Sequence, residues 1–365
     1  MATIRDRGKG KWQAQVRKKG YSLQTRTFQY KADAEKWAKG IERDMERGVF
    51  ISREEAENTT LGDLIDRYIK EVTPSKRSQI NEEQRLRFLK SKLGKHNFAA
   101  LQSKDIAKFR DDRLAEGKAP ATVVRELNNL SHVIDTAIKD WSIWIPSNPV
   151  KSVRRPSVSN ARDRRLKSGE EKALLEACEA GRCEQLASLV RLALETAMRL
   201  GELLALRWEN IDLDSQVAHL PKTKNGDSRD VPLSTTAVRV LQGLKDKLKQ
   251  DQDIAEKVVI LSQKRAEERV FYTWLKADSF ENAWRRAIKL AKEKHAEARM
   301  EAGQLADVRF LDDLRFHDLR HEATTRIAEK VSNILELAAV TGHKELKMLK
   351  RYYHPHAEEL AKKLG

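Results

Sequence analysis

The sequence predicts a mainly α-helical protein with small β-sheets, divided into more than one domain. Apolar residues recur at helical spacing over most of the chain, which indicates helices packed on a core. Short runs of alternating polarity occur only near residues 11–28 and 217–233, where we expect strands. With 365 residues, the chain is too long for one ordinary domain and fits two or three that each bury a core.

The composition favours a polyanionic partner. The formal net charge is +16, and nucleic acid is the first candidate, although ribosomes and acidic lipids also attract basic proteins. The sequence has no apolar run near 18 residues and no signal-peptide pattern, so we expect a soluble cytoplasmic protein without a membrane partner. Cys178 and Cys183 are too few for a disulfide framework or a zinc site, and we expect reduced thiols packed between helices.

Residues 1–55 are expected to form a small β-sheet backed by a helix. The runs KWQAQVRK and YSLQTRTF flank Gly20 and read as paired strands. The following stretch ends near Gly48 and places five apolar residues on one helical stripe: Ala34, Trp37, Ala38, Ile41 and Met45. This region is either a DNA-binding module or a basic appendage that serves solubility or protein contacts.

Residues 58–147 are expected to form a helical bundle. Four periodic segments are separated by Pro74, Gly94 and a Gly117–Pro120 break, and Pro120 suits the first turn of the last helix. Lys104 and Lys108 lie on an outer, charged face. Such a face either lies against phosphates or is an ordinary solvated helix surface.

Residues 148–167 read as a basic linker. Prolines and serines alternate with arginines, a composition that does not favour a regular element. We expect this segment to follow DNA, with four arginines as candidate phosphate contacts: Arg154, Arg155, Arg164 and Arg165.

A mixed α and β domain is expected over residues 168–365. A capping box from Ser168 to Glu171 predicts the start of its first helix. A later helix leads to Arg199, for which Glu202 is an expected ion-pair partner one turn on. Asn225–Gly226 predicts a tight hairpin turn. Lys224 then stands beside the hairpin tip, where by default it is only a solvated charge.

The stretch from His317 to Tyr353 carries most of the candidate chemistry. His317 and Arg320 are three residues apart, so they share one face of a helix. Arginine offers a planar fork of donors that suits a phosphate, and a nearby histidine can donate a hydrogen bond or move a proton. The residues therefore indicate an oxyanion ligand.

Two motifs in this order resemble the active site of the tyrosine recombinases, the phage integrase family. The first is TAMRLGELLALRW, which contains Arg199. The second is HDLRHEA followed by TGH, which ends at His343, with Tyr352 nine residues later. The resemblance covers most of residues 160–356. It implies four parts, in chain order an arm-type DNA-binding domain (1–55), a helical core-binding domain of SAM-like fold (58–147), a basic linker (148–167) and a catalytic domain (168–365).

The resemblance also implies the chemistry of a phosphodiester cleavage. Tyr352 would be the nucleophile that becomes joined to the 3′-phosphate of DNA. Arg199 and Arg320 would hold the non-bridging oxygens, and His343 would add a donor. Because the tyrosyl ester retains the bond energy, rejoining would need no ATP.

Three further assignments follow from family spacing. Lys224, rather than Lys222, is seven residues before the V-P-L that ends the hairpin, and would protonate the leaving 5′-oxygen. His317 would assist proton transfer or orient the nucleophile. Adjacent helical residues point about 100° apart, so only one of Tyr352 and Tyr353 can meet the phosphate, and the family spacing from His343 selects Tyr352.

We expect no metal and no other cofactor. His317 and His321 have the spacing of a zinc-hydrolase motif, but Asp318 replaces the glutamate that such a site needs, and His321 is expected to pack or bond locally. Nucleotide-binding and acyl-transfer signatures are absent from the sequence.

The expected partners are double-stranded DNA recombination sites, four copies of the chain on that DNA, and accessory DNA-bending proteins, all at the bacterial nucleoid. The N-terminal module favours the integrase of a mobile element or prophage. The catalytic half also resembles shufflon-type DNA invertases. An inactive DNA-binding relative and a relaxing topoisomerase remain as alternatives.

Overall fold

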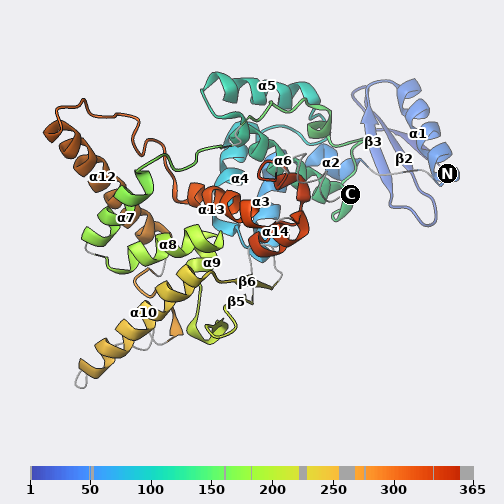
Figure 1. Cartoon of the computed structure of the whole chain (residues 1–365). Helices are drawn as coiled ribbons and strands as arrows, with labels where there is room; N and C mark the ends of the chain where they lie inside the picture. The colour runs from blue at the N-terminus through green and yellow to red at the C-terminus, as the bar shows by residue number, and fades with distance from the viewer. Residues whose placement is uncertain are drawn as a thin grey trace, which may run out of the picture. The chain divides into compact units, whose positions relative to one another are not determined.

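The chain folds into two compact units, residues 1–160 and 161–365, each with its own core. The computed structural model describes residues 2–48, 50, 53–159, 162–181, 183–221, 228–254, 268–274, 277–331 and 333–353. Its helices and small sheets, drawn in Figure 1, confirm the predicted fold class. No helix in these ranges combines the length and the apolar character that crossing a bilayer would require.

The first unit begins with a three-stranded antiparallel sheet in the order β1 (Ala2–Asp6), β2 (Trp12–Val16) and β3 (Gln24–Phe28). Helix α1 (Lys31–Glu46) packs on this sheet, and its buried residues meet Ala14 and Val16 of the central strand. The two predicted strands and the helix are confirmed. Strand β1 was not predicted, because only Ala2 and Ile4 mark its inner face.

A helical bundle completes the first unit. It consists of α2 (Glu54–Asn58), α3 (Leu61–Glu71), η1 (Thr73–Ser75), α4 (Gln79–Leu93), α5 (Ser103–Ala115) and α6 (Pro120–Lys139). A capping box between Thr60 and Asp63 starts α3, and Pro120 occupies the first turn of α6 as predicted. The core of the bundle centres on Leu127 and Leu130, which are fully buried.

The segment after the bundle differs from the prediction in one respect. The structure has a short 3₁₀ helix, η2 (Pro149–Ser152), within the predicted irregular linker. Asn148 caps this helix by accepting a hydrogen bond from the Val150 backbone at 3.0 Å, and Val150 is fully buried in the bundle core. The prolines therefore terminate the bundle before the second unit begins.

The second unit is built around α8 (Gln185–Thr196), most of whose residues are buried. Helices α7 (Glu170–Ala180), α10 (Thr235–Ile254) and α13 (Phe316–Lys330) pack against it. The remaining helical elements are α9 (Leu200–Leu204), η3 (Trp208–Asn210), α12 (Ala277–Glu301), α14 (Ile334–Thr341) and η4 (Leu346–Met348). Because α8 supports both α9 and α13, it fixes two of the elements that carry candidate site residues.

A second antiparallel sheet lies in this unit, in the order β4 (Ile211–Asp212), β5 (Val217–Leu220) and β6 (Arg229–Pro232). Ala218 pairs with Val231, and both side chains are fully buried in the core. The predicted strand pairing is therefore confirmed. The turn between β5 and β6, with Lys224, lies outside the described residues.

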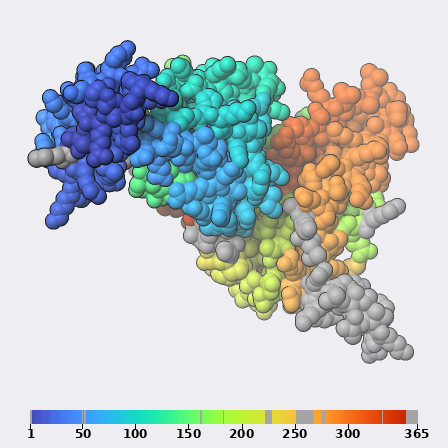
Figure 2. Space-filling model, turned by 180° about the vertical axis from the view of Figure 1, so that it is seen from behind, coloured from blue at the N-terminus to red at the C-terminus, as the bar shows by residue number. Residues whose placement is uncertain are grey.

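Helix α12 anchors the start of α13 through aromatic contacts. Phe280 and Trp284 each meet the ring of Phe316 edge to face, with centroids 4.8 and 5.4 Å apart. Both Phe280 and Trp284 are buried in the core of the second unit. The opposite side of α12 is open to solvent and contributes to the orange surface in Figure 2.

Candidate active site

Five of the six predicted catalytic residues line one pocket of the second unit: Arg199, His317, Arg320, His343 and Tyr352. They come from the start of α9, the first turns of α13, the end of α14 and the turn after η4. The sequence separates Arg199 from Tyr352 by more than 150 positions, and the fold brings both side chains to one cavity.

Arg199 is held by a carboxylate three residues later. It occupies the N-cap position of α9, and its guanidinium donates to Glu202 Oε1 at 2.7 Å. The Arg199 backbone N–H also donates to Glu202 Oε2 at 3.0 Å. The predicted ion pair is thus present, and the buried carboxylate fixes the orientation of the arginine toward the pocket.

Arg229 is a residue of this site that the sequence analysis missed. It extends from β6, donates to Glu202 Oε2 at 2.7 Å and donates to the Val340 carbonyl at 2.5 Å. Burial would raise the pKa of Glu202, but the Arg199 backbone hydrogen bond and the charge of Arg229 lower that pKa below its ordinary value. Glu202 therefore joins α9, β6 and the end of α14 through one anionic group.

Arg320 is nearly buried, with 5% of its surface exposed. Its guanidinium donates to the Ala197 carbonyl and, at 2.5 Å, to the Thr341 carbonyl. Burial and the nearby charge of Arg199 lower the pKa of Arg320 to about 10, so the side chain stays cationic at neutral pH. The two carbonyls satisfy donors without cancelling the charge.

His343 follows the turn that ends α14. Thr341 Oγ1 lies 2.7 Å from His343 Nδ1 and donates its single proton to the Leu337 carbonyl at 2.6 Å. The imidazole therefore donates from Nδ1 to Thr341, and Nε2 carries no proton while the ring is neutral. Burial and the charges of Arg320 and Arg199 lower the pKa of His343 to about 4. A bound phosphate would oppose these charges and favour a second proton, which makes Nε2 a donor.

Tyr352 lies in a turn rather than on an α-helix. The 3₁₀ helix η4 precedes it, and the backbone N–H of Tyr352 donates to Leu349 at 2.9 Å. The helical spacing assumed in the sequence analysis is therefore wrong for this segment. Tyr352 nevertheless lines the pocket, whereas its neighbour Tyr353 does not. Burial raises the pKa of the Tyr352 phenol, and the charges of Arg351 and Arg320 oppose this rise.

The Tyr352 phenol is hydrogen-bonded to His321 Nδ1. The sequence analysis expected His321 to pack or bond locally, and this contact across 31 residues corrects that expectation. The rings of His317 and His321 meet edge to face, with centroids 5.2 Å apart. The spacing of four residues, considered only as a metal motif, places both histidines on the pocket side of α13.

Two family profiles match the sequence of this chain. The profile described as phage integrase family matches residues 164–359, and that of the phage integrase N-terminal domain matches residues 57–156. The chain belongs to the phage integrase family. It is therefore a tyrosine recombinase, an enzyme of site-specific DNA recombination.

Two relatives and one solved structure illustrate the similarity. A shufflon-specific DNA recombinase of Escherichia coli is 40% identical over 315 residues, which cover 84% of this chain and 71% of the relative. A putative integrase/recombinase of Haemophilus influenzae is 35% identical over 98% of this chain and 89% of its own length. The lambda integrase tetramer bound to a Holliday junction shares the fold, with a TM-score of 0.60 and 20% identity over 96% of this chain and 94% of that one.

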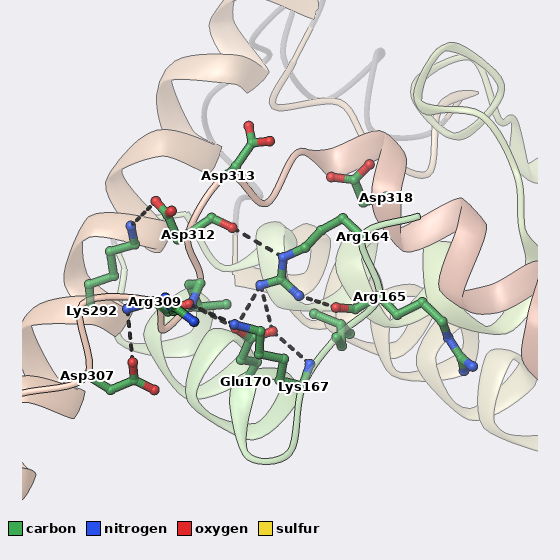
Figure 3. A network of polar contacts seen from close by, with 12 residues as sticks. Arg164, Arg165, Lys167, Glu170, Lys292, Asp307, Arg309, Asp312, Asp313 and Asp318 are labelled. Atoms are coloured by element: carbon green, nitrogen blue, oxygen red, sulfur yellow. Dashed lines mark hydrogen bonds and ion pairs between the residues drawn. The ribbon is translucent and has the colours of Figure 1, made fainter. Parts of the chain in front are cut away.

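The segment that leads into the second unit of this recombinase is tied to that unit by ion pairs (Figure 3). Arg164 donates two hydrogen bonds to the fully buried Glu170, at 2.7 and 2.8 Å. Arg165 pairs with the buried Glu322 at 3.1 Å. Phosphate contact by Arg164 and Arg165 stays a prediction. The structure gives both a role within the protein that the sequence analysis had missed.

The same network corrects the predicted start of α7. Gly169, with a φ of +79°, is the N-cap, and no side chain caps the helix, so the Ser168 to Glu171 box is wrong. The Glu170 carboxylate instead accepts hydrogen bonds from the Lys167 and Leu311 backbones, both at 2.8 Å. These long-range contacts replace the local cap.

The other predicted DNA contacts lie in the first unit. Lys104 and Lys108 are exposed one turn apart on α5, and Arg154 is exposed after η2. Arg155 is partly buried, and its Nη1 atom has no hydrogen-bond partner. Burial lowers the pKa of Arg155. Lys104, Lys108 and Arg154 are thus accessible from solvent, and their contact with DNA stays a prediction.

Proposed function

We propose that this recombinase cuts and rejoins DNA through a covalent bond between Tyr352 and a 3′-phosphate. The observation that carries the proposal is the single pocket that gathers this phenol with Arg199, Arg320 and His343. Two arginines from different elements suit the two non-bridging oxygens of a phosphodiester. Cleavage by a protein nucleophile requires a nucleophilic side chain and cationic groups that stabilise the phosphate, and this pocket contains a phenol and two guanidinium groups.

The remaining roles rest on family spacing and on charge. Lys224 is proposed to protonate the leaving 5′-oxygen, because it sits on the hairpin between β5 and β6 in the sequence. His317 is proposed to support the nucleophile from the first turn of α13. His343 is proposed to donate to a non-bridging oxygen once the bound phosphate has favoured its protonation.

We propose double-stranded DNA recombination sites as the substrate and four copies of the chain as the active assembly. The lambda integrase structure, a tetramer bound to a Holliday junction, supports this assembly by its shared fold. The formal charge of +16 agrees with a DNA partner. Accessory DNA-bending proteins are a further proposal that rests on the family alone.

The biological outcome is proposed to be integration and excision of a mobile element or prophage. Inversion is the second candidate, and the 40% identity to a shufflon-specific recombinase favours it. The DNA that flanks the gene discriminates the two. An attachment site at an element boundary supports integration, and inverted repeats around an invertible segment support inversion.

Covalent trapping tests the proposed chemistry. The substrate is a nicked duplex that carries the recombination site found in the DNA flanking the gene. The wild-type chain should become covalently linked to it, because cleavage next to the nick releases a short fragment that is then lost and cannot be rejoined. Tyr352→Phe should bind this duplex in a gel shift without linking, because it lacks the phenol oxygen. Tyr353→Phe is the matched control and should link normally. An adduct on Tyr353, or an adduct formed by Tyr352→Phe, would contradict the assignment.

A further inference from the structure

The partner of the Tyr352 phenol is a histidine to which no role has been given so far. The Tyr352 hydroxyl and His321 Nδ1 are hydrogen-bond partners. When the neutral imidazole carries its proton on Nε2, Nδ1 accepts the phenol proton. The two rings lie nearly parallel, with an angle of 22° and centroids 5.9 Å apart. The contact already has the geometry that transfer of a proton from Tyr352 would require.

His321 is fixed on a well-anchored helix. Its neighbour Arg320 ties α13 to the carbonyls of Ala197 and Thr341, and Glu322 ties the helix to Arg165. Tyr352, in contrast, reaches the pocket from a turn. The histidine is therefore the fixed partner against which the nucleophile is placed.

We propose that His321 is the general base that accepts the Tyr352 proton during DNA cleavage. This inference rests on the proposed role of Tyr352 as the nucleophile. The bond from Tyr352 Oη to phosphorus forms while the bond from phosphorus to the 5′-oxygen breaks, and the phenol proton moves to His321 Nδ1. The leaving 5′-oxygen takes its proton from a separate acid, assigned above to Lys224. In rejoining, a 5′-hydroxyl attacks the phosphorus and gives its proton to Lys224, while the tyrosyl ester breaks and the proton on His321 returns to Tyr352.

The charges around His321 keep it neutral before DNA binds. Burial lowers the pKa of His321 to about 4, and the charges of His317, Arg351 and Arg320 act in the same direction. Asp318 opposes them, and His343 and Tyr352 face the ring from the other side of the pocket. A neutral ring can accept a proton.

Two effects then favour the transfer as cleavage proceeds. The negative phosphodiester offsets the arginine charges and makes His321 more basic. The phenol proton also becomes more acidic as its oxygen bonds to phosphorus. The pKa values of His321 and of the Tyr352 phenol therefore approach each other during the attack on phosphorus and differ more before it.

Substitution by asparagine separates proton transfer from positioning. The amide of His321→Asn stands near the place of Nδ1 and can accept the Tyr352 hydrogen bond, but it cannot take up a proton. We expect His321→Asn and His321→Ala to lower the single-turnover rate of adduct formation about 10²–10³-fold at neutral pH. The rate of both variants should rise about tenfold per pH unit, because they depend on free phenolate. The wild-type rate should be level over the same range.

A rate for His321→Asn within about threefold of wild type, with an unchanged pH profile, would overturn the proposal and leave a positioning role only. His295→Asn is the control, because His295 lies on α12 and does not line the pocket, and this variant should keep the wild-type rate and the level pH profile. Thermal unfolding and a gel shift on the same nicked duplex establish that each variant is folded and binds. Failure of wild type to form any adduct would instead refute the proposed function.

A DNA substrate with sulfur in place of the bridging 5′-oxygen distinguishes the role of the general base from that of the general acid. A thiolate leaves without being protonated, so this substrate removes the need for an acid. The defect of His321→Asn should persist on it, and full rescue would overturn the assignment as base. Histidine nitrogen NMR gives a readout without DNA. The Nδ1 resonance of His321 should shift in Tyr352→Phe, and an unchanged resonance would contradict the contact.

Discussion

At the scale of single residues, the pocket holds an excess of positive charge in a fixed arrangement. Arg199, Arg229 and Arg320 surround one carboxylate, Glu202, which pairs with the first two. Carbonyl groups take the donors of Arg320. The uncompensated charge suits an anion, and the fixed donors cost little reorganisation when the anion arrives.

The first prediction concerns Glu202, whose lowered pKa links stability to pH. A carboxylate with a lowered folded-state pKa contributes stability that is present above its ordinary pKa and lost as the pH falls through the lowered value. We expect Glu202→Gln to reduce the free energy of unfolding by about 3 kcal/mol at pH 7, because two partly buried guanidinium groups lose a buried counter-ion. The loss should shrink as the pH falls below the ordinary glutamate pKa and through the lowered folded-state pKa of Glu202, because the wild-type carboxyl then becomes protonated.

Urea unfolding at several pH values measures this difference. Glu176→Gln is the control, since Glu176 meets Lys172 at 3.9 Å on an exposed helix face, and it should change stability little. A deficit for Glu202→Gln that stays constant with pH would mean that the loss is not electrostatic.

The residues predicted from the sequence are those marked by local spacing or by the family motifs. Arg199 and Glu202 are three apart at the start of α9, and their ion pair was predicted from that spacing. Arg229 meets Glu202 across 27 residues, and His321 meets Tyr352 across 31. Such contacts depend on how separate elements pack, so no periodicity in the sequence reveals them.

At the scale of elements, the turn after α14 joins the two halves of the pocket. Gly342 ends α14 with a φ of +68°, a conformation that glycine adopts without strain. A Cβ at this position would lie 2.8 Å from Arg229 Nε. The Gly342 carbonyl also lies 3.5 Å from Arg199 Nη2.

We therefore expect Gly342→Ala to impair catalysis more than stability. The added methyl group must displace the Arg229 guanidinium, which holds Glu202, while His343 follows directly in the chain. Adduct formation should slow about tenfold or more, consistent with the cost of a misplaced catalytic group. The matched control is Gly303→Ala, because Gly303 has the same φ of +68° but open space around its Cβ position.

Gly303→Ala isolates the backbone cost, which is about 1–2 kcal/mol for an alanine at positive φ. Thermal unfolding and single-turnover cleavage of both variants give the comparison. Equal cleavage rates for the two variants would show that contact with Arg229 has no catalytic consequence.

The elements themselves were predicted where amphipathic periodicity is long and failed where a short segment is governed by distant contacts. The four bundle helices and the pairing of β5 with β6 follow from patterns of 4 to 20 residues. The cap of α7 was mispredicted because Glu170 bonds to Arg164 and Leu311 instead of serving a local box. The turn that carries Tyr352 was mispredicted because Leu346 and Leu349 fit a 3₁₀ turn as well as an α-helix.

At the scale of the whole molecule, the arginines between the two cores divide into two groups. The second unit begins at residue 161, so Arg164 and Arg165 belong to it by contact as well as by sequence. Arg154 belongs to the first unit and is exposed. The basic segment therefore has two functions: Arg154 contributes charge to the surface of the first unit, and Arg164 and Arg165 form ion pairs with buried glutamates of the second unit.

This division predicts opposite effects for two similar substitutions in the full chain. Arg164→Gln should lower the unfolding temperature of the second unit, because Glu170 is 0% exposed and would lose its counter-ion. A loss of about 3 kcal/mol corresponds to roughly 6–12 °C for a unit of this size. Its affinity for duplex DNA should change less than that of Arg154→Gln, because Glu170 already accepts hydrogen bonds from the Arg164 guanidinium.

Arg154→Gln should leave the unfolding temperature unchanged and weaken DNA binding. If Arg154 contacts one phosphate, the slope of log affinity against log salt should fall by about 0.9. Calorimetry and salt-dependent gel shifts on both variants measure the two quantities. A different result would contradict this division, namely that Arg164→Gln reduces the slope of log affinity against log salt while stability stays unchanged. The Arg164–Glu170 ion pair would then break when DNA binds, and Arg164 would belong to the DNA-binding surface.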